Sequence, residues 1–62
     1  MLKYEISKRN KEERNIWSAV AWTDTWQWAH EIATSLEIIN GGEFAVFVGG
    51  KMIKNLEEAM RC

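Results

Sequence analysis

Apolar and polar residues alternate with a period of two in several short stretches of this chain, which is the pattern of half-buried β-strands. The first stretch spans residues 2–7. Residues 16–22 are largely apolar and rich in β-forming Ile, Trp and Val, so they predict a central strand or one whose outer face is covered. Residues 44–48 and 51–54 predict two more strands. A helix beginning at Glu12 is the alternative for the second stretch, because alanine favours that conformation.

Two short connections join these strands into hairpins. Residues 8–15 are all polar with balanced charge, and they predict a solvated hairpin connection. A loop that contacts phosphate is the alternative for this segment. Gly49 and Gly50 take positive φ at no steric cost, so they predict a two-residue turn. The strands are therefore expected to pair antiparallel.

A single stretch, residues 25–39, has helical periodicity. Asp24 fits an N-cap, and Gln27 three residues later can reach back in a capping box. Residues 40–42 (Asn-Gly-Gly) supply a left-handed stop. At about 100° per residue, one arc of this helix is apolar and expected to be buried, with its two tryptophans at opposite edges. The arc consists of Trp26, Trp28, Ala29, Ile32, Ala33, Leu36 and Ile39.

Residues 55–62 allow two interpretations. Asn55 resembles an N-cap with Glu58 at the third helical position, which predicts a short C-terminal helical turn after a short strand. In the alternative, the strand continues past Leu56. The order of elements is β-β-α-β-β, which predicts an α+β fold of two layers. One helix packs on an antiparallel sheet, in a single domain over residues 1–62.

Length and cysteine content limit what can stabilise this domain. A chain of 62 residues buries only about 60% of the surface that its unfolded form exposes. Cys62 is the only cysteine, so no internal disulfide forms, and it is expected to be frayed and exposed. With one histidine besides, the chain lacks the four ligands of a structural zinc site, and neither metal nor cofactor is expected. Dense aromatic packing or self-association is therefore left as the source of additional stability.

Charge and candidate chemistry narrow the functional class. Eight basic and nine acidic residues give a net charge of −1, without the basic excess of dedicated nucleic-acid binders. No apolar run approaches the ~20 residues of a membrane span, and the N-terminus lacks a secretory signal. We therefore expect a cytoplasmic protein with no membrane partner. His30 is expected on the solvent side of the helix with no converging nucleophile or carboxylate, so enzyme activity is not predicted.

The four tryptophans lie within twelve residues, 17–28, and two of them belong to the second predicted strand. Trp17 and Trp22 have opposite strand parity, so they cannot both face the helix. We predict that Trp22 joins Ile16 and Val20 under the helix. Trp17 is then on the outer face, beside Ala19 and Ala21.

The last hairpin divides between the two faces in the same way. Phe47 and Met52 fall on the face opposite to Val46 and Ile53, where the chain has no second helix to cover them. A patch containing Trp17, Phe47 and Met52 would meet solvent or a partner, and such patches mark association sites. Coverage by loops or by the C-terminal segment is the alternative. Nucleic-acid bases could also stack on these rings.

A family resemblance is carried by two segments. Residues 24–29 (Asp-Thr-Trp-Gln-Trp-Ala) place a Gln-Trp-Ala string at a helix start, and the strand 44–48 is followed by a two-residue turn before Lys51. Across about half of the chain this arrangement resembles the Dmd-type antitoxins of bacteriophages, which bind and inhibit a host messenger-RNA-cleaving toxin. The glycine turn replaces the acidic turn of that family, and the connection after the helix is longer. The layout is also similar to phage inhibitors of host RNA polymerase and to HicB-type antitoxins, which implies a stoichiometric inhibitor of a host enzyme.

We therefore predict a non-enzymatic inhibitor or antitoxin that occludes the functional site of a larger host protein, a toxin nuclease or another host enzyme, in the host cytoplasm. The alternatives are a homodimeric structural or regulatory subunit and, third, a single-stranded nucleic-acid-binding module. The predicted anchors are large apolar side chains, and the predicted rim is basic. The partner-binding residues are Trp17, Trp26, Trp28, Phe47 and Met52, with Lys8, Arg9, Lys11 and Arg14.

Overall fold

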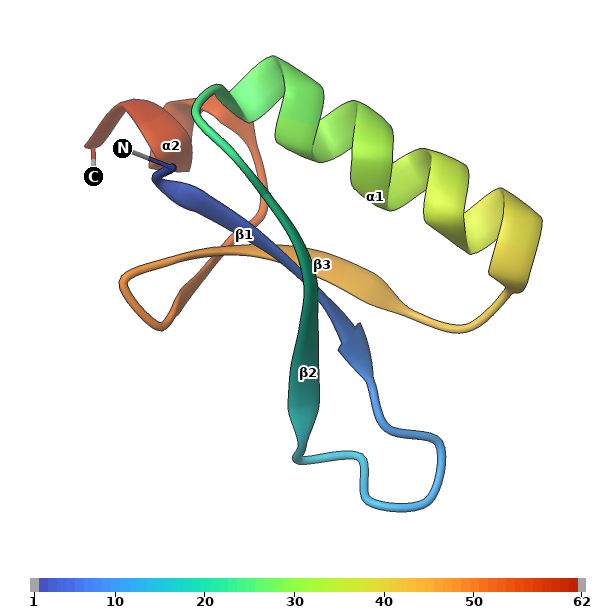
Figure 1. The fold of residues 1–62 in the computed structure, drawn as a ribbon. Helices are drawn as coiled ribbons and strands as arrows, with labels where there is room; N and C mark the ends of the chain where they lie inside the picture. The colour runs from blue at the N-terminus through green and yellow to red at the C-terminus, as the bar shows by residue number, and fades with distance from the viewer. Residues whose placement is uncertain (1, 62) are drawn as a thin grey trace.

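The fold is a four-stranded antiparallel sheet with one long helix packed against it and a short helix at the C-terminal end (Figure 1). The structure, a computed structural model, describes residues 2–61, so the expectation for Cys62 lies outside the described residues. This arrangement confirms the predicted α+β class. The elements are β1 (Tyr4–Arg9), β2 (Trp17–Thr23), α1 (Trp26–Asn40), β3 (Phe44–Val48), β4 (Lys51–Ile53) and α2 (Leu56–Arg61).

The core lies between α1 and the centre of the sheet. The strand order is β2-β1-β3-β4, and the register pairs Ile6 with Val46 and Val46 with Ile53. These three side chains form a buried row across three strands. Ala29 and Ala33 of α1 pack against the row, and their small side chains allow the helix to lie close to the sheet.

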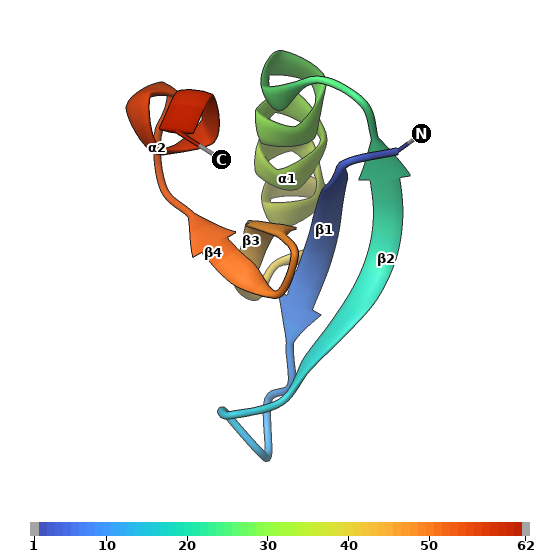
Figure 2. The ribbon, with the colours of Figure 1, turned by 90° about the vertical axis from the view of Figure 1, so that its left-hand side faces the viewer.

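The C-terminal segment is a short strand followed by a helix, as predicted. Asn55 caps α2, because its Oδ1 accepts a hydrogen bond of 2.9 Å from the Glu58 backbone N–H. Ala59 belongs to the same buried cluster as Tyr4 and Ile53. Both helices therefore lie on the same side of the sheet, and they remain on that side when the molecule is turned (Figures 1 and 2).

The start of α1 differs from the prediction by one residue. Thr25 is the N-cap, with extended backbone and an Oγ1 that accepts from the Trp28 N–H at 3.3 Å. The prediction of an Asp24 cap with a Gln27 capping box is therefore wrong. Thr and Asp are both good cap residues, and their order in the sequence does not decide between them. The predicted stop is confirmed, because Gly41 ends the helix with a φ of 71°.

A β-bulge in β2 changes which side chains face the helix. The pairing of β1 with β2 shifts its register between Ile6 and Ser7, which leaves Val20 as an extra residue without a partner. Before the shift Ile6 pairs with Ala21, and after it Ser7 pairs with Ala19. Because an extra residue reverses the alternation of faces, strand parity cannot be carried through Val20.

The bulge overturns the predicted core position of Trp22. Trp22 pairs with Glu5, and Trp17 pairs with Arg9, so both rings lie on the face away from α1. Trp22 is 53% exposed, and Ile16 and Val20 are exposed as well. Ala21, predicted on the outer face, instead packs against the core.

The buried arc of α1 is also narrower than predicted. Trp26, Ile32 and Leu36 pack against the core as expected. Trp28 and Ile39, however, are 60% and 76% exposed. The buried arc is centred on the two buried alanines of α1. Among the described residues, no helix combines the length and apolar character needed to cross a membrane.

Candidate functional site

The face of the sheet opposite α1, which we call the open face, is the candidate site. Its central strand contributes alternate residues of β1, and the register of the pairings places their neighbours on the same face. Since α1 and α2 both pack on the other side, neither helix covers it (Figure 2). The open face consists of Glu5, Ser7 and Arg9 of β1, Trp17, Ala19 and Trp22 of β2, Ala45 and Phe47 of β3, and Met52 of β4.

Two aromatic rings meet across the centre of this face. The ring centroids of Trp17 and Phe47 are 5.3 Å apart at an interplanar angle of 66°, an edge-to-face contact. Because β1 lies between β2 and β3, this contact has to pass over β1. The residues between the two rings are small: Ser7 is fully buried, with Ala19 and Ala45 as its neighbours on the adjacent strands.

The buried Ser7 hydroxyl has a local partner. Its Oγ donates a hydrogen bond of 2.7 Å to Oε2 of Glu5, two residues earlier on the same face. A buried hydroxyl without a partner would destabilise the sheet, so the carboxylate satisfies a group that the two rings cut off from water. The Glu5 side chain is thereby fixed beside the aromatic pair.

Arg9 also contacts the Trp17 ring. Its guanidinium carbon is 4.7 Å from the Trp17 ring centroid, which is cation–π geometry. The same guanidinium makes an ion pair of 3.0 Å with Glu43, to which Arg14 also binds at 2.8 Å. Trp17 is therefore restrained by contacts with both Phe47 and Arg9, and a restrained side chain loses little entropy when it binds a partner.

The structure brings together the predicted patch of Trp17, Phe47 and Met52, of which Trp17 and Phe47 are predicted anchors. Met52 pairs with Phe47 across β3 and β4 and is half-buried, as is Phe47. The sequence prediction missed Trp22 and Glu5, which flank the same patch. Trp22 lies on this face because of the one-residue register shift at Val20. No residue within 16–22 indicates such a shift in the sequence.

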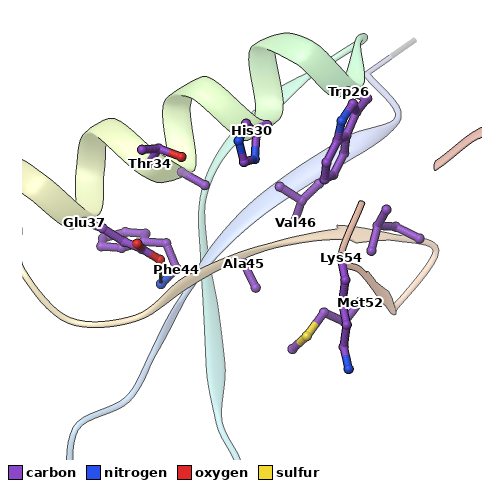
Figure 3. Close-up of a pocket in the computed structure, with 11 residues that line it drawn as sticks. Trp26, His30, Thr34, Glu37, Phe44, Ala45, Val46, Met52 and Lys54 are labelled. Carbon is purple, nitrogen blue, oxygen red and sulfur yellow. Dashed lines mark hydrogen bonds between the residues drawn. The ribbon is translucent and has the colours of Figure 1, made fainter. Parts of the chain in front are cut away.

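The predicted anchor Trp26 lies on the other side of the sheet. It is half-buried, its ring is stacked on His30 with centroids 5.5 Å apart, and both point from α1 toward β3 and β4 (Figure 3). They line a groove of about 310 Å³ between the helix and the last hairpin. At its far end the Phe44 backbone N–H donates a 3.3 Å hydrogen bond to Glu37. His30 is exposed, as predicted.

The remaining predicted residues are also distributed around the molecule. Trp28 is exposed on α1, and Lys8 lies on the helix side of the sheet, 5.9 Å from the Phe44 ring centroid. Lys11 and Arg14 belong to the β1–β2 connection and line, with Arg9, a small hollow of about 100 Å³ at one end of the open face. Five of the nine predicted residues are therefore not part of the open face: Trp26, Trp28, Lys8, Lys11 and Arg14.

Within residues 2–61, no group of three or more His, Cys, Asp or Glu side chains is placed to hold a metal ion. Comparison of the chain with protein-family models, curated proteins and solved structures found no match. The properties of the open face are therefore the basis on which a function can be proposed.

Proposed function

We propose that this protein is a small non-enzymatic inhibitor that covers a functional site of a larger protein with its open face. The observation that carries the proposal is the restrained, incompletely covered pair of Trp17 and Phe47 at the centre of that face. Large aromatic rings in fixed positions are the side chains that most often dominate the energy of protein–protein binding. Inhibition follows from occlusion and needs no chemistry by this chain.

The composition of the open face supports a protein partner. Around the aromatic pair lie Met52, the more exposed Trp22, and one side chain of each charge, Glu5 and Arg9. Aromatic residues, Met and Arg are enriched where proteins bind one another, and a polar rim of mixed charge surrounds such a centre. The ion pairs of Glu43 with Arg9 and Arg14 supply that rim at the end near the β1–β2 connection.

The resemblance to phage antitoxins supports a host enzyme as the target, with a messenger-RNA-cleaving toxin as the first candidate and the bacterial cytoplasm as the place of action. Stacking of single-stranded nucleic acid on the same rings is the competing function. The open face offers one arginine beside one glutamate, whereas single-strand binders follow the phosphate chain with a positively charged groove. A protein partner is therefore favoured.

The test begins with capture of binding partners from bacterial lysate on the immobilised full chain, followed by calorimetric titration of the partner that is recovered. Trp17→Ala should weaken binding by at least about 30-fold, the effect of truncating a central anchor. Ile38→Ala is the matched control, because Ile38 is 79% exposed on α1, away from the open face. Circular dichroism establishes that both variants are folded.

Two outcomes would contradict the proposal. In one, folded Trp17→Ala and Phe47→Ala bind the captured protein as tightly as the original chain. In the other, the chain binds a single-stranded oligonucleotide with an affinity that falls steeply as salt increases, which is the signature of phosphate contacts. A one-to-one complex in which the activity of the captured enzyme is lost supports inhibition by occlusion.

A further inference from the structure

The outer edge of β2 carries backbone groups that no other strand pairs with. The strand order places β2 at one border of the sheet, and β1 is its only neighbouring strand in the described part of the chain (Figure 2). A strand at such a border presents a row of unpaired N–H and C=O groups to any extended chain that can reach it. β2 is seven residues long and contains neither a charged residue nor proline.

The opposite border of the sheet, β4, has features that protect an edge strand. β4 is three residues long, and it begins with the exposed Lys51. Short length and charge both discourage pairing with another chain, whereas β2 has only its bulge as protection. β2 is therefore the edge that is open to pairing.

The backbone groups of Trp17 point away from β1. The Asn10 N–H donates to the Ile16 carbonyl oxygen at 2.9 Å, so residues 10 and 16 direct their backbone groups toward each other. Successive residues of an antiparallel strand direct these groups to alternate sides, so those of Trp17 point to the free edge. The Arg9 N–H gives the same result. It donates to the Glu43 carbonyl oxygen, on the side of β3, and Arg9 is the partner of Trp17.

Trp22 is oriented in the same way beyond the bulge. Its partner on β1 is Glu5, which lies an even number of residues before Arg9 and therefore also directs its backbone groups toward β3. Those of Trp22 consequently point to the free edge. Trp17 and Trp22 are also the tryptophans whose rings lie on the open face. One extended segment along β2 can therefore pair with their backbone groups and place its own side chains against their rings.

The other face of the same edge is basic. Ser18, which pairs with Lys8 on the helix side, borders a hollow of about 380 Å³. The charged residues that line this hollow are three basic side chains and one carboxylate: Lys8, Arg9, Lys11 and Glu12. Neither Lys8 nor Lys11 forms an ion pair within the described residues 2–61. An acidic side chain on this face of an added strand therefore meets a net positive charge.

We propose that the partner of the open face contributes an extended segment that pairs with the outer edge of β2, and that apolar and acidic side chains alternate along this segment. The apolar side chains lie against Trp17 and Trp22, and the acidic ones face Lys8 and Lys11. In strand addition of this kind the main chain supplies affinity, and alternate side chains supply specificity. This proposal rests on the proposed function, since it describes how the target reaches the open face.

A second copy of β2 matches this edge less well than a segment of the target does. β2 has no carboxylate to place against Lys8 and Lys11. Each copy also has the bulge at Val20, and pairing the centre of β2 with itself opposes two interrupted edges. An acidic segment with a regular edge avoids both problems.

Amide hydrogen exchange of the full chain, measured by NMR, tests pairing at this edge. The probe is a short capped peptide of alternating valine and glutamate at millimolar concentration. Saturation with this peptide should slow exchange of the Trp17 and Trp22 amides at least about fivefold, because each amide gains a backbone partner. The Ser18 amide points to β1 and is the internal control. A peptide of alternating valine and lysine should have no such effect.

Three results would overturn the proposal. In the first, saturating peptide leaves exchange at Trp17 and Trp22 unchanged. In the second, it slows the Ser18 amide as much as the two tryptophan amides. In the third, both tryptophan amides exchange slowly in the free chain and faster on dilution, which would show that a second copy occupies the edge.

Removal of one backbone donor separates this proposal from the proposed function. A synthetic full chain that is N-methylated at Trp17 keeps the ring but loses the outward N–H. It should bind the target recovered from lysate at least about fivefold more weakly. N-methylation at Met52 is the matched control and should leave the affinity unchanged. Met52 pairs with Phe47, whose backbone groups face β1, so the Met52 N–H points outward at the other border of the sheet.

The two proposals fail in different ways. If N-methylation at Trp17 leaves the affinity unchanged while Trp17→Ala lowers it, the open face binds through its rings alone, and pairing with β2 is contradicted. If the exchange of the Trp17 and Trp22 amides slows in the complex but the activity of the recovered target is unaffected, strand pairing is supported and inhibition is contradicted.

Discussion

The two faces of the sheet are built in opposite ways. On the face covered by α1, branched aliphatic side chains such as Ile6 and Val46 are buried by alanines of the helix. On the open face, large rings lean over a centre of small residues, and Trp17 meets Phe47 above Ser7. The covered face therefore packs small helix residues against aliphatic strand residues, while the open face places Trp17, Trp22 and Phe47 where a partner can reach them. Substitutions on the two faces should accordingly affect different properties.

The largest effect is expected on the covered face. Ile6→Ala should lower the free energy of unfolding by about 2–5 kcal/mol, because Ile6 is fully buried at the centre of the core. Urea denaturation monitored by circular dichroism measures the loss. Ile38→Ala, at an exposed position of α1, should change stability by less than about 0.5 kcal/mol. Similar losses in the two variants would mean that the core does not lie under α1.

Two adjacent residues of β3 offer the sharpest contrast between the faces. Val46 is buried under the helix, whereas Phe47 is half-buried on the open face. Val46→Ala should reduce stability by about 1–3 kcal/mol while the folded protein keeps its affinity for the target. Phe47→Ala should reduce affinity by at least about tenfold. Urea denaturation measures the stability of both variants, and calorimetric titration measures their affinity for the target. Equal affinities of the two variants for the target would show that Phe47 is not part of the binding surface.

A smaller effect is expected at the start of α1. Thr25→Ala should reduce stability by about 1 kcal/mol, because it removes the oxygen that accepts from the Trp28 N–H. Asp24→Ala is the matched control one residue earlier, and it should change the free energy of unfolding by less than about 0.5 kcal/mol. Thermal or urea denaturation compares the two. A larger loss for Asp24→Ala would restore Asp24 as the cap.

The smallest effect is expected at the rim of the open face. Glu43→Gln removes the carboxylate shared by Arg9 and Arg14, and surface ion pairs of this kind contribute about 0–1 kcal/mol. Stability should fall by no more than that, and the difference from the original chain should shrink in high salt because exposed charges are screened. A loss that persists in high salt would show that Glu43 positions Arg9 by more than charge.

Local sequence patterns were sufficient to predict the order of the strands and helices. The patterns located the four strands, although β1 runs through Lys8 and Arg9, which were predicted to belong to the connection. The glycine pair at 49–50 located the last turn, and helical periodicity located α1 within one residue at each end. Asn55 and Glu58 indicated a helix at residues 55–62 as one of two interpretations, because a cap acts through neighbouring residues alone, and the structure has that helix as α2. These features depend on a few adjacent positions, which a sequence records directly.

The face of Trp22 could not be predicted in this way, because it depends on the pairing between strands. One extra residue at Val20 reverses every face assignment beyond it, and strand parity contains no sign of that insertion. The exposure of Trp28 has a similar origin, since it depends on how far the sheet extends beneath the helix. The placement of Trp17, Phe47 and Met52 was predictable because no bulge separates them from the turns that set their register.

Radical footprinting of the complex with the captured target tests the central claim most directly. Trp22 and Met52 lie on the open face, whereas Met60 is exposed on α2 on the helix side and serves as an internal control. If the open face binds the target, oxidation of Trp22 and Met52 should slow several-fold in the complex, while oxidation of Met60 stays unchanged. Oxidation of Trp22 and Met52 at the same rate in free and bound protein would contradict the account.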